Sequence, residues 1–233
     1  MHPDLTPRLI ARGQTDAPIE MLSITNSFGV PSKDPSIWQE DVKKAIRCAG
    51  NGQMLILSFM GTVKENQTQK AFIQDFVRVA ELSFETGSKV LEANLSCPNI
   101  GNEGLVCYNI DVTRQVVKGI RKVIGSTPLV LKVGYYKNQD DLEKIAEITH
   151  EYANCIAVIN SLQAEVLDEN GNQALPGKNR LRSGICGASI KWAGIEMVEK
   201  LDKIRKEKNL ILVWLMEQVL NLHLIRREVS VLI

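Results

Sequence analysis

The sequence lacks several features that would assign it to a specialised class of protein. Its 28 Lys and Arg residues nearly balance its 27 Asp and Glu residues, so charge favours neither nucleic acid nor a membrane surface as partner. Its five cysteines form no CxxC pair and its three histidines are not at ligand spacing, which argues against disulfides and a metal site and fits a reducing cytoplasm. The amino terminus has no signal-peptide core, and the longest apolar run, 210–216, is shorter than a membrane span of about 20 residues.

What is present instead is an alternation of apolar strands and amphipathic helices. The spacing predicts strands at 21–26, 54–59, 89–95, 128–133, 155–160 and 210–214, and helices at 36–49, 68–85, 111–124, 140–152 and 187–207. Ser36 with Gln39 is interpreted as a capping box for the first helix, and Asp111 as the cap of the third. Strands separated by helices of this length are typical of parallel βαβ units with both sheet faces covered.

Polar residues lie at the carboxyl ends of successive predicted strands. They are Asn26 and Ser27, Ser58, residues 94–99, Lys132, and Asn160 with Ser161. In a (β/α)8 barrel these ends converge on one mouth, whereas a doubly wound sheet would bring only a few of them together. No GxGxxG follows the first strand. We therefore predict an α/β fold of the (β/α)8, or TIM-barrel, type.

Two features of this predicted mouth have chemical potential. The run Asn94-Leu-Ser-Cys-Pro-Asn99 places a thiol between amides that can read the edge of a flat heterocycle, although the same residue types are common in ordinary turns. Lys132 ends an apolar strand, where it requires a polar or anionic partner or else extends its ammonium to solvent.

These residues resemble a known family. Asn94-Leu-Ser-Cys-Pro-Asn, Leu131-Lys132-Val, Asn160-Ser161 and Ser183-Gly184, in this order, resemble motifs of the dihydroorotate dehydrogenases, and the resemblance covers about residues 6–212. Those enzymes are FMN-dependent (β/α)8 barrels of pyrimidine (UMP) biosynthesis. The flavin domain of dihydropyrimidine dehydrogenase shares much of the pattern.

The resemblance implies a role for each matching residue. Cys97 would be the general base, as in the soluble class 1 enzymes, and a thiol with a tuned pKa can take a proton from the substrate ring. Lys132 would face the pyrimidine end of the flavin and stabilise its negative charge. The implied substrate-binding residues are Asn26, Asn94, Asn99, Asn160 and Ser161, and the implied cofactor-binding residues are Asn94, Lys132, Ser183 and Gly184.

The sequence also departs from the family pattern at both ends. The family has two strands before the segment resembling Thr6-Pro-Arg, and it has Gly-rich phosphate-binding turns and one more strand after the segment resembling 210–213. This chain has no glycine after Gly194. We therefore expect an incomplete barrel over 1–212 and an atypical apolar tail over 213–233, and we hypothesise that the tail is translated in a shifted reading frame.

The expected function is that of a cytoplasmic oxidoreductase that converts dihydroorotate to orotate with FMN. The expected partner is this small molecule, with no nucleic acid or membrane, and enzymes of this type are often homodimers. Two alternatives stay open at this point. One is a flavin enzyme acting on another dihydropyrimidine, and the other is a non-catalytic remnant that does not bind flavin.

Overall fold

The core of the protein is a five-stranded parallel sheet. A computed structural model describes residues 22–26, 32–62, 64, 66–96, 106–168 and 170–216. The strand order is β2-β3-β4-β5-β8, and every neighbouring pair is parallel. The strands are β2 (Ile56–Phe59), β3 (Val90–Asn94), β4 (Leu129–Lys132), β5 (Cys155–Val158) and β8 (Val213–Met216). The predicted βαβ succession is confirmed for these strands.

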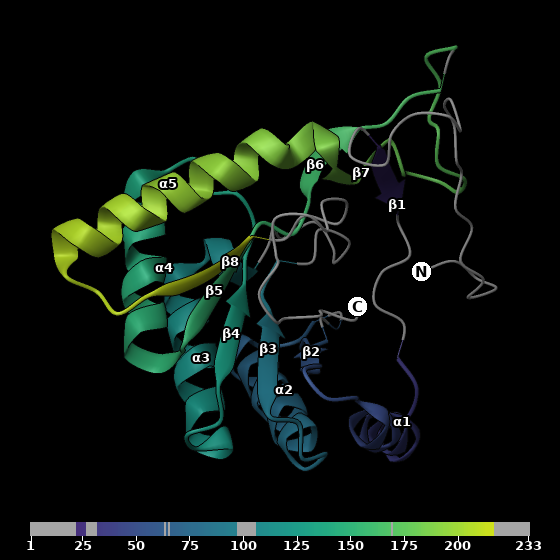
Figure 1. Cartoon of the computed structure of the whole chain (residues 1–233). Helices are drawn as coiled ribbons and strands as arrows, with labels where there is room; N and C mark the ends of the chain where they lie inside the picture. Colours follow the sequence, from purple (N-terminus) through teal and green to yellow (C-terminus); the bar gives the residue numbers. More distant parts are fainter. Residues whose placement is uncertain are drawn as a thin grey trace.

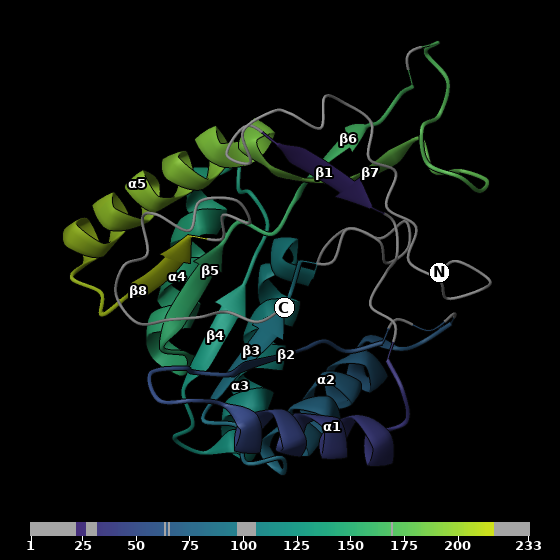
Figure 2. The same cartoon turned by 45° about the vertical axis from the view of Figure 1, so that its right-hand side comes forward.

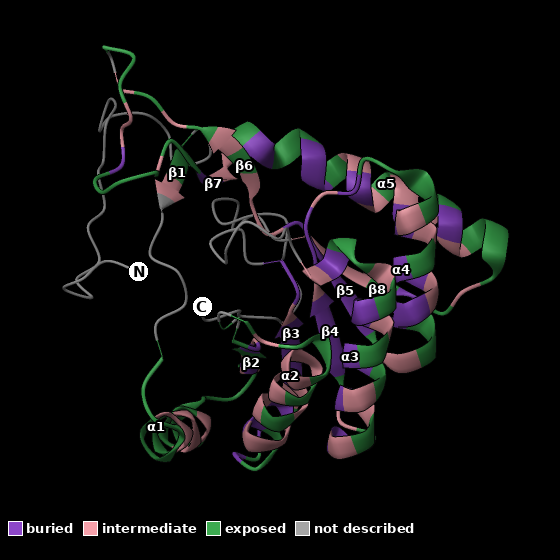
Figure 3. Ribbon diagram, turned by 180° about the vertical axis from the view of Figure 1, so that it is seen from behind, coloured by how far each residue is buried: buried purple, intermediate pink, exposed green. Residues whose placement is uncertain are grey.

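Helices pack against one face of this sheet (Figure 1). They are α2 (Gln69–Phe84), α3 (Ile110–Ile124), α4 (Gln139–Tyr152) and α5 (Lys191–Lys208). In Figure 3 the buried residues lie along the strands and on the helix sides that face them. The large buried cluster between the two layers contains Leu91 and Ala93 of β3, Leu131 of β4, and Ile120 and Ile145 of the helices.

The opposite face of the sheet, which we call the inner face, has a smaller cluster. Side chains alternate between the faces of a strand, so the residues next to those facing the helices define it. Val130, Cys155 and Ala157 are buried there, with Val90 and Leu215 packed against them. In a (β/α)8 barrel this face lines the interior. The described part of the chain is thus an incomplete barrel of the predicted type.

A second sheet of three antiparallel strands corrects the prediction for the first strand. β1 (Ser23–Asn26) pairs with β7 (Arg182–Gly187), which also pairs with β6 (Leu162–Glu165). Figures 1 and 2 place this sheet beyond the carboxyl ends of the parallel strands. The predicted strand at 21–26 therefore exists but does not join the parallel sheet, and the β6–β7 hairpin was not predicted.

The caps of two helices also differ from the prediction. Helix α1 (Pro35–Cys48) begins after Asp34, whose Oδ1 accepts hydrogen bonds from the Ser36 amide at 2.9 Å and the Ser36 hydroxyl at 2.7 Å. Asp34 rather than Ser36 is the cap because Pro35 occupies the first helical position. Asn109, not Asp111, caps α3 by accepting from the Val112 amide at 3.1 Å.

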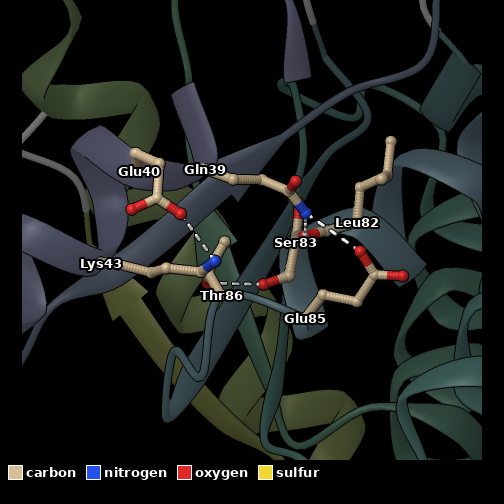
Figure 4. Close-up of polar contacts among 7 residues, drawn as sticks. All are labelled: Gln39, Glu40, Lys43, Leu82, Ser83, Glu85 and Thr86. Atoms are coloured by element: carbon tan, nitrogen blue, oxygen red, sulfur yellow. Dashed lines mark hydrogen bonds and ion pairs between the residues drawn. The ribbon is translucent and has the colours of Figure 1, made fainter. Parts of the chain in front are cut away.

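Gln39, expected in the capping box, instead joins α1 to the end of α2 (Figure 4). Its Nε2 donates to the Leu82 carbonyl oxygen at 2.8 Å and to Glu85 Oε2 at 3.0 Å. On the solvent side of α1, Lys43 Nζ lies 2.8 Å from Glu40 Oε1. The Glu40–Lys43 pair lies within α1, so of these contacts only the two hydrogen bonds of Gln39 join α1 to α2, and no residue of α1 is buried.

The end of the described chain extends the sheet past the expected domain boundary at 212/213. β8 pairs with β5 from Val213, opposite Cys155, to Met216, opposite Val158. The guanidinium carbon of Arg205 in α5 lies over the Trp214 ring of β8, 5.2 Å from the centroid of that ring. Residues 217–233 of the predicted tail lie outside the described residues. The assignment of 213–233 as a separate tail stays a prediction.

Candidate active site

Three of the predicted site residues lie together at the carboxyl end of the parallel sheet. Asn94 is the last residue of β3 and Lys132 the last of β4, and the two are paired in the strand register. Asn160 follows β5 and its Nδ2 donates to Asn94 Oδ1 at 3.3 Å and to the Ser96 carbonyl oxygen at 2.8 Å. The prediction that these strand ends converge is confirmed for these three residues.

Backbone hydrogen bonds continue beyond the strand ends and hold this group in place. The Leu95 amide donates to the Lys132 carbonyl oxygen at 2.9 Å, and the Asn160 amide donates to that of Val133 at 3.0 Å. Asn94 Oδ1 also accepts from the Ser96 amide at 3.2 Å. The ends of β3, β4 and β5 are therefore hydrogen-bonded to one another, which limits how far the polar side chains can move.

Ser161, another predicted substrate-binding residue, follows Asn160 and is half-buried.

Cys97 and Asn99 lie outside the described residues, and a backbone hydrogen bond joins the described residues on either side of 97–105. The segment leaves after Ser96, and the Cys107 amide beyond it donates to the Leu95 carbonyl oxygen at 3.0 Å. The Tyr136 hydroxyl donates to the Cys107 carbonyl oxygen. The chain thus returns next to the point where it leaves β3.

The second cysteine of this region is unsuited to act as a base. Cys107 is completely buried, and burial raises the pKa of its thiol to about 11. Burial likewise raises the pKa of the Tyr136 hydroxyl well above its ordinary value. Both groups stay protonated at neutral pH, so neither is suited to take a proton from a substrate.

The remaining predicted residues form a second group in the antiparallel sheet. Asn26 of β1 pairs with Gly184 of β7, and the structure describes the backbone of Asn26 but not its side chain. Ser183 is buried, with its hydroxyl 2.6 Å from that of Thr25, and the Thr25 hydroxyl also donates to the Gly184 carbonyl oxygen at 3.0 Å. Ser183 is therefore committed to holding β7 against β1.

The prediction from sequence missed Glu92, a buried charged residue on the inner face. It is 6% exposed, and Ser58 Oγ donates to its Oε1 at 2.7 Å. The signal was present in the sequence, because Glu92 is the one charged residue within the apolar run 90–93. Ser58 was expected at the mouth and lies instead one pair from the end of β2, beside Glu92.

Two kinds of feature are absent from the described ranges. No helix there is both long enough and apolar enough to cross a membrane. No group of three or more His, Cys, Asp or Glu residues in those ranges is arranged to hold a metal ion.

Comparison with known sequences gives a consistent result. The family model described as dihydroorotate dehydrogenase matches residues 6–213. A dihydroorotate dehydrogenase of Dictyostelium discoideum is 34% identical over 198 residues, which is 82% of this chain and 52% of that protein. The catalytic subunit of dihydroorotate dehydrogenase B (NAD(+)) from Brachyspira hyodysenteriae is 27% identical over 139 residues, 58% of this chain and 45% of that protein.

Solved structures support the same fold. A crystal structure of DHODH from Eimeria tenella in complex with ferulenol has a TM-score of 0.62 and 14% sequence identity, and the match covers 84% of this chain and 56% of that one. The ligand-free enzyme gives 0.60 with the same identity. The chain spans about half the length of the curated relatives that it matches. Since the family model covers most of its residues, the chain belongs to the dihydroorotate dehydrogenase family.

Proposed function

We propose that this chain contributes to an FMN-dependent oxidation of dihydroorotate to orotate in pyrimidine biosynthesis. The observation that supports it best is the group Asn94, Lys132 and Asn160 at one end of the inner face, in a member of this family. Two amides and an ammonium offer donors and acceptors to a flat heterocycle with carbonyl and imide edges. We further propose a cytoplasmic location and a homodimer.

The described residues fit the pyrimidine end of FMN. Asn94 and Lys132 stand above an apolar floor formed by Val130, Ala157 and Leu215, which suits a flat ring system. Ser96 Oγ is buried and has no hydrogen-bond partner among the described residues, so it is an additional donor next to Asn94. When bound, FMN would supply the acceptor for the hydride that leaves the substrate ring.

The side chains of the protein would stabilise charge, orient the bound ring and remove the proton. Lys132 supplies a fixed positive charge where negative charge develops, and Asn94 and Asn160 orient the ring by its amide edges. We assign Cys97 as the base that takes the proton from the ring carbon, Asn26, Asn99 and Ser161 as further substrate contacts, and backbone groups at Ser183 and Gly184 as cofactor contacts. These assignments follow the family resemblance of the residues.

The first test is whether the full chain retains FMN after incubation and desalting, measured by its visible absorption spectrum. We expect a retained flavin band, and a dissociation constant at least about tenfold higher for Lys132→Ala, which is about 1.4 kcal/mol of binding free energy. Lys178→Ala, at an exposed loop position, is the matched control and should bind as the parent does. A chain that stays colourless would overturn the proposal and favour the non-catalytic alternative.

The second test identifies the substrate by anaerobic bleaching of the bound flavin. We expect bleaching by dihydroorotate, and none by dihydrouracil, which has no carboxylate. Cys97→Ala should retain the flavin but no longer bleach, whereas Cys48→Ala, at an exposed position, should bleach normally. Bleaching by dihydrouracil alone would favour the alternative of another dihydropyrimidine.

A further inference from the structure

The inner face of the sheet contains a charge that the proposed function does not use. Glu92 lies in the middle of β3 and is 6% exposed. Its Oε1 accepts one hydrogen bond, from Ser58 Oγ at 2.7 Å. A hydroxyl group alone offsets only part of the desolvation of a carboxylate, and a positive charge nearby would stabilise it further.

The strand register places one cation diagonally across from Glu92 on the same face. Glu92 is paired with Val130, and Lys132 is two residues further along β4, on the same face. Strands about 4.8 Å apart and a rise of about 6.6 Å per two residues separate such diagonal neighbours by about 8 Å at Cβ, within the reach of two long side chains. Among the inner-face positions of the five described parallel strands, Lys132 is the one cationic residue.

The negative charge of Glu92 also affects the pKa of a residue on β5, on the same face of the sheet. Cys155 of β5 lies opposite Val130, and burial raises the pKa of its thiol to about 12, with the Glu92 charge as the second cause. The carboxylate therefore acts over the region of the inner face from which Lys132 rises. Because the Cys155 thiol stays neutral, it does not compete with Glu92 as an anion for the ammonium.

We propose that Glu92 is a positioning residue for Lys132. The carboxylate, held by Ser58, keeps the Lys132 amine protonated and aligned along the inner face, so that its charge is fixed at the mouth before any ligand arrives. This inference rests on the proposed function in one respect only: the proposed function names flavin as the ligand that the Lys132 ammonium would face. In this arrangement Glu92 supplies the negative charge in the middle of the inner face, and Asn94 and Asn160 supply the hydrogen-bonding groups at its carboxyl end.

The test measures the protonation of Lys132 in the full chain without FMN. A trace of acetic anhydride acetylates only neutral amines, and mass spectrometry compares the Lys132 peptide with that of the exposed Lys178. For Glu92→Gln we expect acetylation of Lys132 at pH 8 to rise about tenfold, because a nearby negative charge favours the ammonium form. At pH 10.5 the difference should shrink. Mere loosening of the fold would raise acetylation at both pH values.

Matched variants separate charge from structure. Glutamine retains the oxygen that accepts from Ser58, so the sheet should be preserved, as circular dichroism will check. Glu92→Asp keeps the charge at shorter reach and should give a smaller rise of two- to threefold, which decides the question if Glu92→Gln does not fold. Glu151→Gln, which removes an exposed carboxylate beside Arg114 on the outer helices, should leave Lys132 unchanged.

The outcomes distinguish this inference from the proposed function. Equal acetylation of Lys132 at pH 8 in the parent chain and the folded Glu92 variants overturns the inference, even if FMN binds and needs Lys132. If the acetylation changes as expected but no chain binds FMN, the positioning role stands and the proposed function fails.

Discussion

At the scale of single residues, Arg121 links several segments at the amino-terminal end of the parallel strands. Its guanidinium donates to three backbone oxygens, those of Tyr152 at 2.7 Å, Gly125 at 2.7 Å and Thr127 at 2.8 Å, and to Asn154 Oδ1 at 3.0 Å. Burial lowers the pKa of this guanidinium. One side chain thus joins the ends of two helices to the connections that lead into β4 and β5.

We predict that Arg121→Ala lowers the free energy of unfolding by about 2 kcal/mol, because it leaves several partly buried carbonyl groups without their charged donor. Urea denaturation followed by circular dichroism measures this. Arg114→Ala is the control, since Arg114 makes an exposed ion pair with Glu151 at 2.7 Å and should have a much smaller effect. Equal losses in the two variants would contradict the special role of Arg121.

The sequence predicted the position of a site residue correctly where a single rule determines that position. Asn94, Lys132 and Asn160 could be brought together because polar residues at the ends of parallel strands share one edge. Glu92 was missed because a charge inside an apolar run can point to either face, and its environment depends on which strands flank it. Ser58 lies one residue before the end of β2, so its hydroxyl meets Glu92 rather than the group of Asn94 and Lys132.

At the scale of elements, α2 and α3 pack closely at a glycine. A methyl group on Gly119 of α3 would lie 2.6 Å from Val77 Cγ2 of α2, which is closer than two carbon atoms can approach. Glycine inside a helix costs about 1 kcal/mol relative to alanine. The close approach of the two helices is the structural reason for glycine at this position.

We predict that Gly119→Ala destabilises the chain by about 1 kcal/mol, because the overpacking outweighs the gain in helix propensity. Gly194→Ala in α5 is the matched control, since the nearest atom there, Met216 Cγ, is at an ordinary contact distance of 3.5 Å, and it should be neutral or stabilising. Thermal unfolding compares the two variants. Adding Val77→Ala should relieve the Gly119→Ala clash, and a stabilised Gly119→Ala would contradict the prediction.

Local patterns predicted the helices better than the antiparallel sheet. Amphipathic spacing and Gly125 at the end of α3 are local signals, and the structure confirms α2, α3 and α4 within a few residues of the expected ranges. The pairing of Asn26 with Gly184 joins segments far apart in the chain, and no local rule specifies it. The predicted α-helix at 187–207 begins later, at Lys191, because Gly187 belongs to β7 and Ala188–Ile190 form a 3-10 turn.

At the scale of the whole molecule, the described chain forms part of a barrel rather than a closed one. The parallel sheet ends at β2 on one side and β8 on the other, within the residues described. Edge strands present unpaired backbone groups that favour association with other chains. Val213 of β8 is 57% exposed on the inner face, opposite Cys155. An apolar, exposed edge of this kind is where we expect the chain to associate.

We therefore predict that Val213→Lys slows concentration-dependent association of the chain severalfold without a measurable change in stability, because a charge on an edge strand opposes pairing with another edge. Light scattering during incubation, with sedimentation velocity at several concentrations, measures the effect. Leu167→Lys is the matched control: it adds the same charge at a residue 51% exposed, outside the parallel sheet. If both variants slow association equally, added charge rather than the β8 edge is responsible, and the open edge is not the main route by which these chains meet.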